Sequence, residues 1–185
     1  MNISEYLRES VKAMNSAPDL EADLEYLSAL IWERLQSEGT VFWLGNGGSA
    51  GDSQHLATEL VGRFARLRKP LKSIALTTNA SLITALANDD GYDTVFSRQV
   101  EAFVQPIDVV IGISTSGQSV NVLHALRTAK DRGALVIGFT GFNKNPMDEL
   151  ADYVFHAPSM VTGVIQQMHI TFGQALCLGL ENRID

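Results

Sequence analysis

Apolar residues follow a helical period over two stretches at the start of the chain. They recur every three or four residues over positions 3–14, and again over positions 20–35 after an interruption at Pro18. Two amphipathic helices are therefore expected before the first strand. The apolar stripe of this leading pair must pack either on the sheet of the same chain or on another subunit, and the sequence pattern leaves both alternatives open.

Short, continuous apolar runs then predict buried strands that alternate with helices. The expected strands cover residues 40–44, 71–76, 108–114, 134–140 and 153–156, and helices are expected over 49–64, 80–87, 95–104 and 120–132. This alternation is typical of a doubly wound parallel sheet of the flavodoxin or Rossmann type. We predict a single α/β domain over residues 1–185, with N-terminal helices at 1–38 and the α/β core and last helix at 40–185.

The last helix is expected over residues 161–181, and it is apolar around almost its whole circumference. Such a helix is buried, and we expect it in a subunit interface. Gly163, Gln166, Ile170 and Gln174 fall on one stripe of it. Two glutamines on a buried helix need polar partners, either in a binding site or across an interface.

A glycine-rich loop, Gly45–Ser49, connects the first expected strand to a helix. Glycines allow close approach of the backbone to a ligand, and a helix N-terminus attracts anions. Ser49 is the expected N-cap of the helix, with Asp52 completing a capping arrangement. The loop matches neither the dinucleotide-binding nor the Walker pattern, so an ordinary strand-to-helix turn remains an alternative.

Hydroxyl groups gather at a second strand-to-helix junction. Its side chains are Ser114, Thr115, Ser116 and Ser119, with Gly117 between them. One serine would be enough to cap the helix, and four hydroxyls exceed that need, so we favour a phosphate site. Ligands of doubly wound sheets lie beyond the carboxyl ends of the strands, and the two loops are therefore expected to converge on one pocket.

The helix that follows the glycine-rich loop carries a polar stripe of Asp52, His55 and Glu59. His55 and Glu59, four residues apart, could share a proton, bind a metal ion or form an ordinary surface pair. The opposite stripe is expected in the core, and it consists of Leu56, Leu60, Val61 and Phe64. A basic run over residues 63–72 is read as solvated surface, and residues 88–93 as a polar turn that could bind a polyol.

Composition narrows the class of protein. The chain of 185 residues has a formal net charge of −7, with 45% hydrophobic and 19% charged residues. This balance is globular and argues against direct binding of nucleic acid. The single cysteine, Cys177, cannot form an intramolecular disulfide, and no apolar run is long enough to cross a membrane. We expect a cytoplasmic protein that binds no membrane.

Four segments together resemble the sugar isomerase (SIS) family, and within it the phosphoheptose isomerases. They are GNGGSAGDSQHLATELVGRF, ALANDDGYDTVFSRQV, ISTSGQSVNVLHAL and IQQMHI, in that order. The resemblance implies a parallel sheet flanked by helices and a homotetramer with sites at subunit boundaries. It also implies conversion of sedoheptulose 7-phosphate to D-glycero-D-manno-heptose 7-phosphate through an enediol, a reaction that needs no redox cofactor.

The resemblance also implies roles for individual residues. Glu59 would move the proton between C1 and C2, and some family members bind zinc through positions that match His55, Glu59 and Gln166, together with a histidine of the last helix. The implied substrate-binding residues are Asn46, Gly47, Gly48, Ser49, Asp89, Ser114, Thr115, Ser116, Ser119 and Gln166. Among these, Ser49 and the four hydroxyls of the second loop would hold the phosphate.

Two positions depart from the family pattern. Gln174 stands where the family has that histidine, and Gly163 where an aspartate is frequent. A glutamine amide does not titrate near neutral pH and is a weaker zinc ligand, so a second proton transfer would fall to His55 or water and zinc affinity would drop. A non-catalytic branch, which associates with the bacterial replication initiator, lacks the carboxylate that matches Glu59. The presence of Glu59 favours an isomerase, with an isomerase of another phosphosugar as a third possibility.

Overall fold

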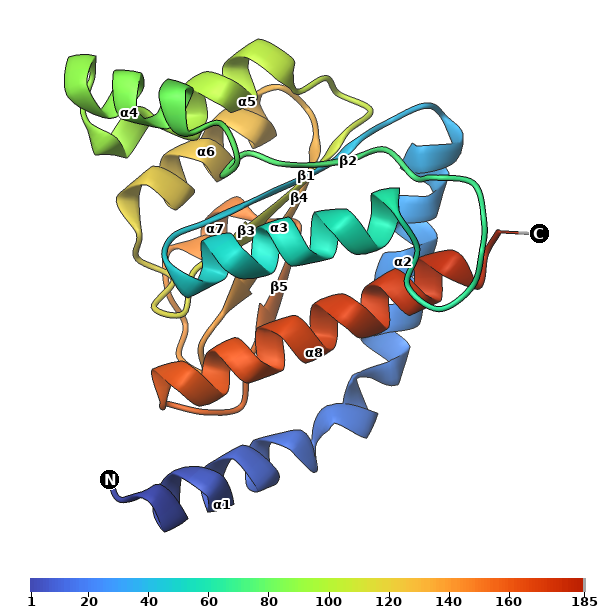
Figure 1. Ribbon diagram of the computed structural model, residues 1–185, viewed down its shortest axis with the longest axis vertical. Coiled ribbons are helices and arrows are strands. Elements are labelled where there is room, and N and C mark those ends of the chain that lie inside the picture. Colours follow the sequence, from blue (N-terminus) through green and yellow to red (C-terminus); the bar gives the residue numbers. More distant parts are fainter. Residues whose placement is uncertain (185) are drawn as a thin grey trace.

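Five parallel strands form one sheet in the order β2-β1-β3-β4-β5 in the computed structural model, which describes residues 1–184 (Figure 1). The predicted α/β fold class is therefore confirmed. The elements are α1 (Ile3–Met14), η1 (Ala17–Leu20), α2 (Glu21–Gln36), β1 (Val41–Gly45), α3 (Gly48–Val61), β2 (Ser73–Ala75), α4 (Ala80–Asp89), η2 (Tyr92–Thr94), α5 (Ser97–Phe103), β3 (Val109–Ile113), α6 (Val120–Asp131), β4 (Leu135–Thr140), α7 (Met147–Leu150), β5 (Tyr153–His156) and α8 (Thr162–Glu181).

The strand order reverses between β1 and β3, which makes this pair the topological switch point of the sheet. The two strands are in register from Val41 opposite Val109 to Gly45 opposite Ile113. The glycine-rich loop and the hydroxyl-rich loop start directly after these last two paired residues. The predicted convergence of the two loops therefore follows from the register of one strand pair.

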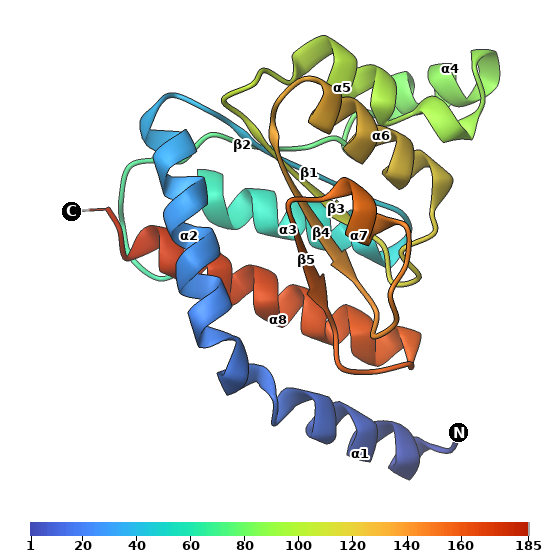
Figure 2. The same ribbon diagram turned by 180° about the vertical axis from the view of Figure 1, so that it is seen from behind.

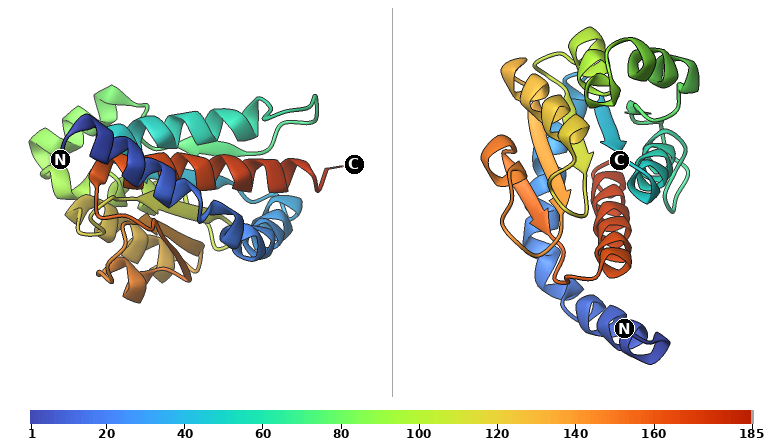
Figure 3. Two further views of the ribbon diagram at one scale, coloured as in Figure 1. Left: turned by 90° about the horizontal axis from the view of Figure 1, so that it is seen from below. Right: turned by 90° about the vertical axis from the view of Figure 1, so that its left-hand side faces the viewer.

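Successive side chains along the strands point alternately into two separate hydrophobic cores, one on each face of the sheet. Trp43 of β1 belongs to the core covered by α2, α3 and α8, whereas Phe42 belongs to the core covered by α5, α6 and α7. Both faces of the sheet are thus covered, as Figures 2 and 3 show. In the first core Phe155 stacks on Phe172 of α8, with ring centroids 4.0 Å apart. These contacts fix α8 against the sheet beside α3.

The two leading helices differ in what they bury. Leu27 and Ile31 of α2 are fully buried in the first core, so α2 packs on its own chain. The helix α1 instead runs outside α8 (Figure 3), and most of its large apolar side chains are exposed. Ile3 is 82%, Leu7 57% and Val11 60% exposed. Within residues 1–184, α2 therefore buries its apolar side chains against its own chain, whereas most of those of α1 stay exposed.

Several local predictions are corrected by the structure. Val61, expected in the core, is 48% exposed because it lines an open surface hollow between α3 and β2, together with Thr58 and Ile74. The segment expected as a turn from residue 88 begins as the last turn of α4, which continues to Asp89. The helix Thr162–Glu181 is buried as expected, with Met168 and Leu176 fully enclosed.

The basic run after α3 is not wholly solvated. The Arg68 guanidinium is 3% exposed, and its Nε donates to Oε1 of Glu181 over 3.2 Å. The two carboxylate oxygens of Glu181 also accept the backbone N–H groups of Phe64, Ala65 and Arg66 at 2.8–3.1 Å. Glu181 thus ties the segment after α3 to the end of α8. Within residues 1–184, no helix combines the length and the apolar character needed to cross a membrane.

Candidate functional site

The glycine-rich loop lets α3 begin close to the sheet. A Cβ at Gly45 would lie 2.8 Å from the Cβ of Ser49 and 2.9 Å from the carbonyl oxygen of Ile113, so only glycine allows this approach. Gly47 has φ +55° and is itself the residue that precedes the helix. Ser49, which is 6% exposed, therefore lies inside the first turn next to the end of β3.

The predicted N-cap is consequently wrong. The helix starts at Gly48, Gly47 occupies the cap, and no side chain accepts a hydrogen bond from the first backbone N–H groups. Asp52 makes no capping bond either, and its Oδ2 is buried with no hydrogen-bond partner in the described residues. Burial raises the pKa of Asp52 to about 6, against a smaller opposing effect of His55. The uncapped first turn leaves its donors available to an anion.

The hydroxyls of the second loop form a cluster. Ser114 Oγ lies 3.0 Å from Ser119 Oγ and 3.5 Å from Ser116 Oγ. Ser119 occupies the N-cap of α6, yet its side chain makes no capping bond and contacts Ser114 instead. The cluster therefore consists of groups that each keep hydrogen-bonding capacity for a further acceptor. Its position beside the uncapped start of α3 suits a phosphate.

Gly117 shapes the hydroxyl-rich loop at a left-handed turn, with φ +66°. A Cβ there would lie 2.0 Å from Oδ1 of Asn145, so the loop rests directly on the β4–α7 segment. The side chain of Asn145 is fixed in turn by donation to Thr140 Oγ1 at 3.1 Å and by acceptance from the Met147 N–H at 3.1 Å. The hydroxyls are thus held on a rigid support.

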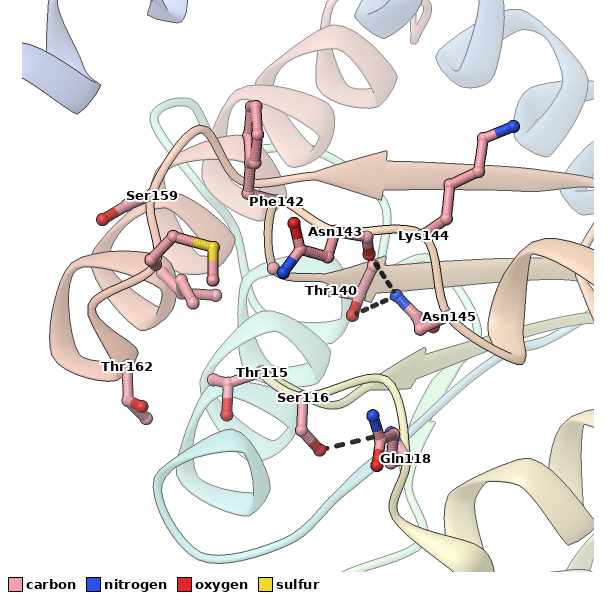
Figure 4. Close-up of a pocket in the computed structure, with 13 residues that line it drawn as sticks. Thr115, Ser116, Gln118, Thr140, Phe142, Asn143, Lys144, Asn145, Ser159 and Thr162 are labelled. Atoms are coloured by element: carbon pink, nitrogen blue, oxygen red, sulfur yellow. Dashed lines mark hydrogen bonds between the residues drawn. The ribbon is translucent and has the colours of Figure 1, made fainter.

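An open cavity of about 240 Å³ is lined by part of this loop (Figure 4). Its walls include Thr115, Ser116, Thr140, Asn143, Lys144 and Ser159. Figure 4 shows Ser116 receiving the N–H of Gln118, a bond of 3.2 Å. Neither His55 nor Glu59 lines the cavity. The cavity therefore includes Thr115 and Ser116 of the hydroxyl-rich loop but not the polar stripe of α3.

Asn46 joins the two loops. Its Nδ2 donates to Oδ1 of Asn121 over 2.8 Å, and its Oδ1 accepts from Nδ2 of Asn121 over 2.9 Å. The Tyr92 hydroxyl adds a third bond, to Asn46 Oδ1 at 3.1 Å. Asp89, predicted to contact the sugar, lies exposed on the last turn of α4, where it accepts from Asn88. From the segment of α4 and η2, it is Tyr92 that hydrogen-bonds to the glycine-rich loop, through Asn46.

His55, Glu59 and Gln174 meet between α3 and α8. His55 Nε2 lies 2.9 Å from Glu59 Oε1 and 3.2 Å from Gln174 Nε2. The His55 side chain is 48% exposed and that of Glu59 is 19% exposed. The structure thus brings together Glu59 and His55, for which the sequence predicts proton transfers, and Gln174, which stands in place of the family's histidine. Gln166 extends the row, because its amide lies against Gly48, where a Cβ would be 2.1 Å from Nε2.

This donor set does not fit zinc well. Zinc sites in proteins are built from cysteine, histidine and carboxylate ligands. Here the candidate ligands are one imidazole, one carboxylate and the amides of Gln166 and Gln174. In addition, His55 Nε2 already faces both Glu59 and the amide nitrogen of Gln174, which is a donor and repels a cation. Within residues 1–184, no group of three or more histidine, cysteine or acidic side chains is arranged to hold a metal ion.

Sequence reasoning missed two polar residues at the loops, Asn121 and Tyr92. Asn121 comes two residues after Ser119 and could have been noticed as an amide at the start of a helix. Tyr92 lies in one of the segments that carry the family resemblance.

Comparison with known proteins identifies the family. The pattern of the SIS domain matches residues 5–141. The phosphoheptose isomerase of Aquifex aeolicus is 45% identical over 183 residues, which cover 98% of this chain and 96% of that protein. The phosphoheptose isomerase of Synechocystis is 44% identical over 184 residues, covering 98% and 95%.

Solved structures agree with these relatives. The phosphoheptose isomerase of Neisseria gonorrhoeae superposes with a TM-score of 0.90 at 35% identity and covers 97% of each chain. The phosphoheptose isomerase of Francisella tularensis gives a TM-score of 0.92 at 30% identity, covering 98% of this chain and 97% of that one. The match in sequence, in fold and over nearly the whole length places the chain in the phosphoheptose isomerase group of the SIS domain family.

Proposed function

We propose that the protein interconverts sedoheptulose 7-phosphate and D-glycero-D-manno-heptose 7-phosphate. The observation that carries this proposal is the contact of Glu59 with His55 on α3, two to three helical turns after the uncapped start of that helix. A carboxylate in reach of an imidazole, on the same helix as a phosphate-sized group of donors, is what a ketose–aldose isomerase needs. The curated relatives at about 45% identity support the substrate.

The phosphate is assigned to the serine cluster and to the first turn of α3. Ser114, Ser116 and Ser119 supply hydroxyl donors, and the turn at Ser49 supplies backbone N–H groups and the positive end of the helix dipole. No arginine or lysine is needed at this point, which fits the acidic net charge of the chain. Binding at the phosphate would place the open-chain sugar along α3, towards Glu59.

Glu59 then acts as the base. Its carboxylate takes a proton from C1 of the ketose, which leaves an enediol, and returns a proton to C2 to give the aldose. The carbonyl oxygen on C2 gains a proton while the hydroxyl group on C1 loses one, and His55 is the group placed to exchange these protons. Electrons move only within the sugar, so neither an oxidant nor a reductant takes part.

Gln174 influences the tautomer of His55 in the His55–Glu59 pair and does not itself act as a general acid. With a proton on Nε2, His55 donates to Glu59, and with the proton on Nδ1, its Nε2 accepts from the Gln174 amide. The two partners favour opposite tautomers of one ring. The second arrangement leaves the Glu59 carboxylate free to act as a base. We propose accordingly that turnover does not depend on tightly bound zinc.

We further propose that the enzyme works in the cytoplasm as a homotetramer. The exposed apolar side chains of α1, Ile3, Leu7 and Val11 among them, support a contact between subunits. The only cysteine, Cys177, is buried and reduced, as suits a reducing compartment. A molar mass from light scattering of four times the chain mass is the expected result for the assembly.

The test is turnover of sedoheptulose 7-phosphate followed by NMR. The wild type should form the aldose, and Glu59→Gln should lower kcat by at least about a hundredfold, because general-base catalysis is worth 10² or more. Glu33→Gln, on the exposed surface of α2, is the matched control and should leave kcat unchanged. A wild type inactive on this sugar but active on another phosphosugar would change the substrate, and inactivity on all of them would favour a non-catalytic binding protein.

A further inference from the structure

One face of α8 points at the site, and its first position has no side chain. Gln166 contacts Gly48 at the start of α3, and Gln174 contacts His55 further along that helix. Gly163 lies on the same face, one turn before Gln166. A side chain at residue 163 would therefore be the first member of this polar row.

The space at Gly163 is taken by Tyr6 of α1. A Cβ built on Gly163 would lie 2.8 Å from the Tyr6 hydroxyl oxygen and 3.3 Å from its ring. Glycine within a helix is less favourable than alanine by about 1 kcal/mol. This cost is offset here by the close approach of a half-buried tyrosine that packs on the first core.

The Tyr6 hydroxyl is held in one orientation but is not saturated. Gln167 Nε2 donates to the hydroxyl oxygen over 3.0 Å. Since the oxygen is the acceptor in that bond, its own proton remains available to another group. The next polar side chain along the row is Gln166, at the edge of the glycine-rich loop. The Tyr6 hydroxyl thus lies at the Gly163 position, one helical turn from the residue of α8 that contacts the start of α3.

We propose that Tyr6 is a substrate-binding residue whose hydroxyl donates a hydrogen bond to an oxygen of the polyhydroxylated chain of the phosphosugar. This inference rests on the proposed isomerase function and adds α1 to the site. The polar group that completes the α8 row is supplied by a different helix, about 160 residues away in sequence. Gly163 is required because a side chain there would displace this hydroxyl.

The direct test is Tyr6→Phe, which removes only the hydroxyl. Loss of one hydrogen bond of about 1–1.5 kcal/mol corresponds to a five- to tenfold rise in the KM for sedoheptulose 7-phosphate. We expect kcat to change less than KM and the melting temperature to stay within about 2 °C. Tyr26→Phe, on the exposed side of α2, is the matched control and should change neither constant. An unchanged KM in Tyr6→Phe overturns the proposal.

A second experiment separates binding from turnover. Calorimetry with sedoheptulose 7-phosphate in the Glu59→Gln background should show the same five- to tenfold loss of affinity on adding Tyr6→Phe. Gly163→Ser with Tyr6 in place should also weaken binding, because the new side chain collides with the hydroxyl. In the Tyr6→Ala background, Gly163→Ser should restore part of the affinity that Tyr6→Ala loses, and no restoration would count against a role for this position. A wild type that does not bind the sugar at all contradicts the proposed function itself, whereas equal binding by wild type and Tyr6→Phe contradicts only the role of Tyr6.

Discussion

Asn46 and Asn121 exchange two hydrogen bonds, of 2.8 and 2.9 Å, across the switch point of the sheet. One residue belongs to the loop after β1 and the other to the first turn of α6. Asn121 is 3% exposed, so water does not compete for these bonds. The pair fixes the distance between the two loops to which we assign the phosphate.

Replacing Asn121 by alanine should therefore weaken substrate binding. Two amide bonds are lost and Asn46 is left with Tyr92 alone, a change worth about 1–2 kcal/mol. We expect KM for the phosphosugar to rise about five- to thirtyfold while the secondary structure is retained. Steady-state kinetics and circular dichroism measure the two effects. Asn15→Ala, at the exposed end of α1, provides the comparison, and a KM for Asn121→Ala equal to that of Asn15→Ala would contradict the assigned role.

Glu181 should contribute strongly to stability above about pH 4. Burial on its own raises its pKa, but the N–H groups of residues 64–66 and the Arg68 guanidinium outweigh this effect and lower the pKa below its ordinary value. A lowered carboxyl pKa gives stability that is present above the pKa of the unfolded chain and is lost as pH falls through that of the folded chain.

The corresponding variant is Glu181→Gln, which leaves the Arg68 charge buried without its counter-ion. Removal of one partner from a buried ion pair costs about 3–5 kcal/mol, so the melting temperature should fall by roughly 10 °C at pH 7. The difference from the wild type should shrink as the pH is lowered below 4. Thermal unfolding between pH 3 and 7 measures this, with Glu101→Gln at an exposed ion pair as the control. A constant difference over the whole pH range would refute the electrostatic explanation.

Gln174→His should strengthen zinc binding at the His55–Glu59 pair. The change would place a second imidazole next to His55 and Glu59, which supplies three ligands of the kind that zinc prefers. Metal analysis of protein purified without added metal should give well below one zinc per wild-type chain and close to one per Gln174→His chain. Gln36→His, at the end of α2, controls for adventitious binding by a surface histidine. Stoichiometric zinc in the wild type would show that the amides of Gln166 and Gln174 are sufficient to complete a zinc site.

Asp52 should destabilise the fold near neutral pH. Its pKa is raised to about 6 by burial, so the folded state holds a proton that the unfolded chain has already released. Stability is therefore lost as pH rises from about 4 to about 6. Asp52→Asn should raise the free energy of unfolding at pH 7.5 by about 1 kcal/mol, after allowance for solvent screening, and by much less at pH 4. Urea unfolding at both pH values tests this, and equal effects at the two would show that the carboxyl does not titrate as described.

The parallel sheet could be predicted from the sequence because buried parallel strands read as continuous apolar runs. These runs do not give the strand order, so the switch point between β1 and β3 could not be located from them. The same runs placed both loops at strand ends, and their meeting then follows from the pairing of Gly45 with Ile113. Contacts between helices distant in sequence could not be predicted in this way. Period alone located Gln174 on a stripe of α8, but only the packing of α8 on α3 brings its amide to His55.

The errors have two physical causes, which are the backbone conformation of one glycine and a tertiary contact between residues distant in sequence. Ser49 is a good cap by propensity, yet the positive φ of Gly47 starts the helix earlier and buries the serine. Arg68 lies in a run of charges that is typical of a protein surface. It is buried because its guanidinium pairs with the buried carboxylate of Glu181, more than a hundred residues later. No window of local sequence contains both partners.

The buried ion pair between Arg68 and Glu181 also has a genetic consequence. Besides Glu181, the guanidinium donates to the carbonyl oxygens of Glu59 and Leu60 at 2.7 and 2.8 Å, so it holds the backbone of the residue that we propose as the base. A lysine has one nitrogen in place of this planar fork and cannot make the three contacts together. We therefore expect a conservative Arg68→Lys allele to be inherited as a loss of activity, although the substitution lies outside the residues to which we assign catalysis and substrate binding.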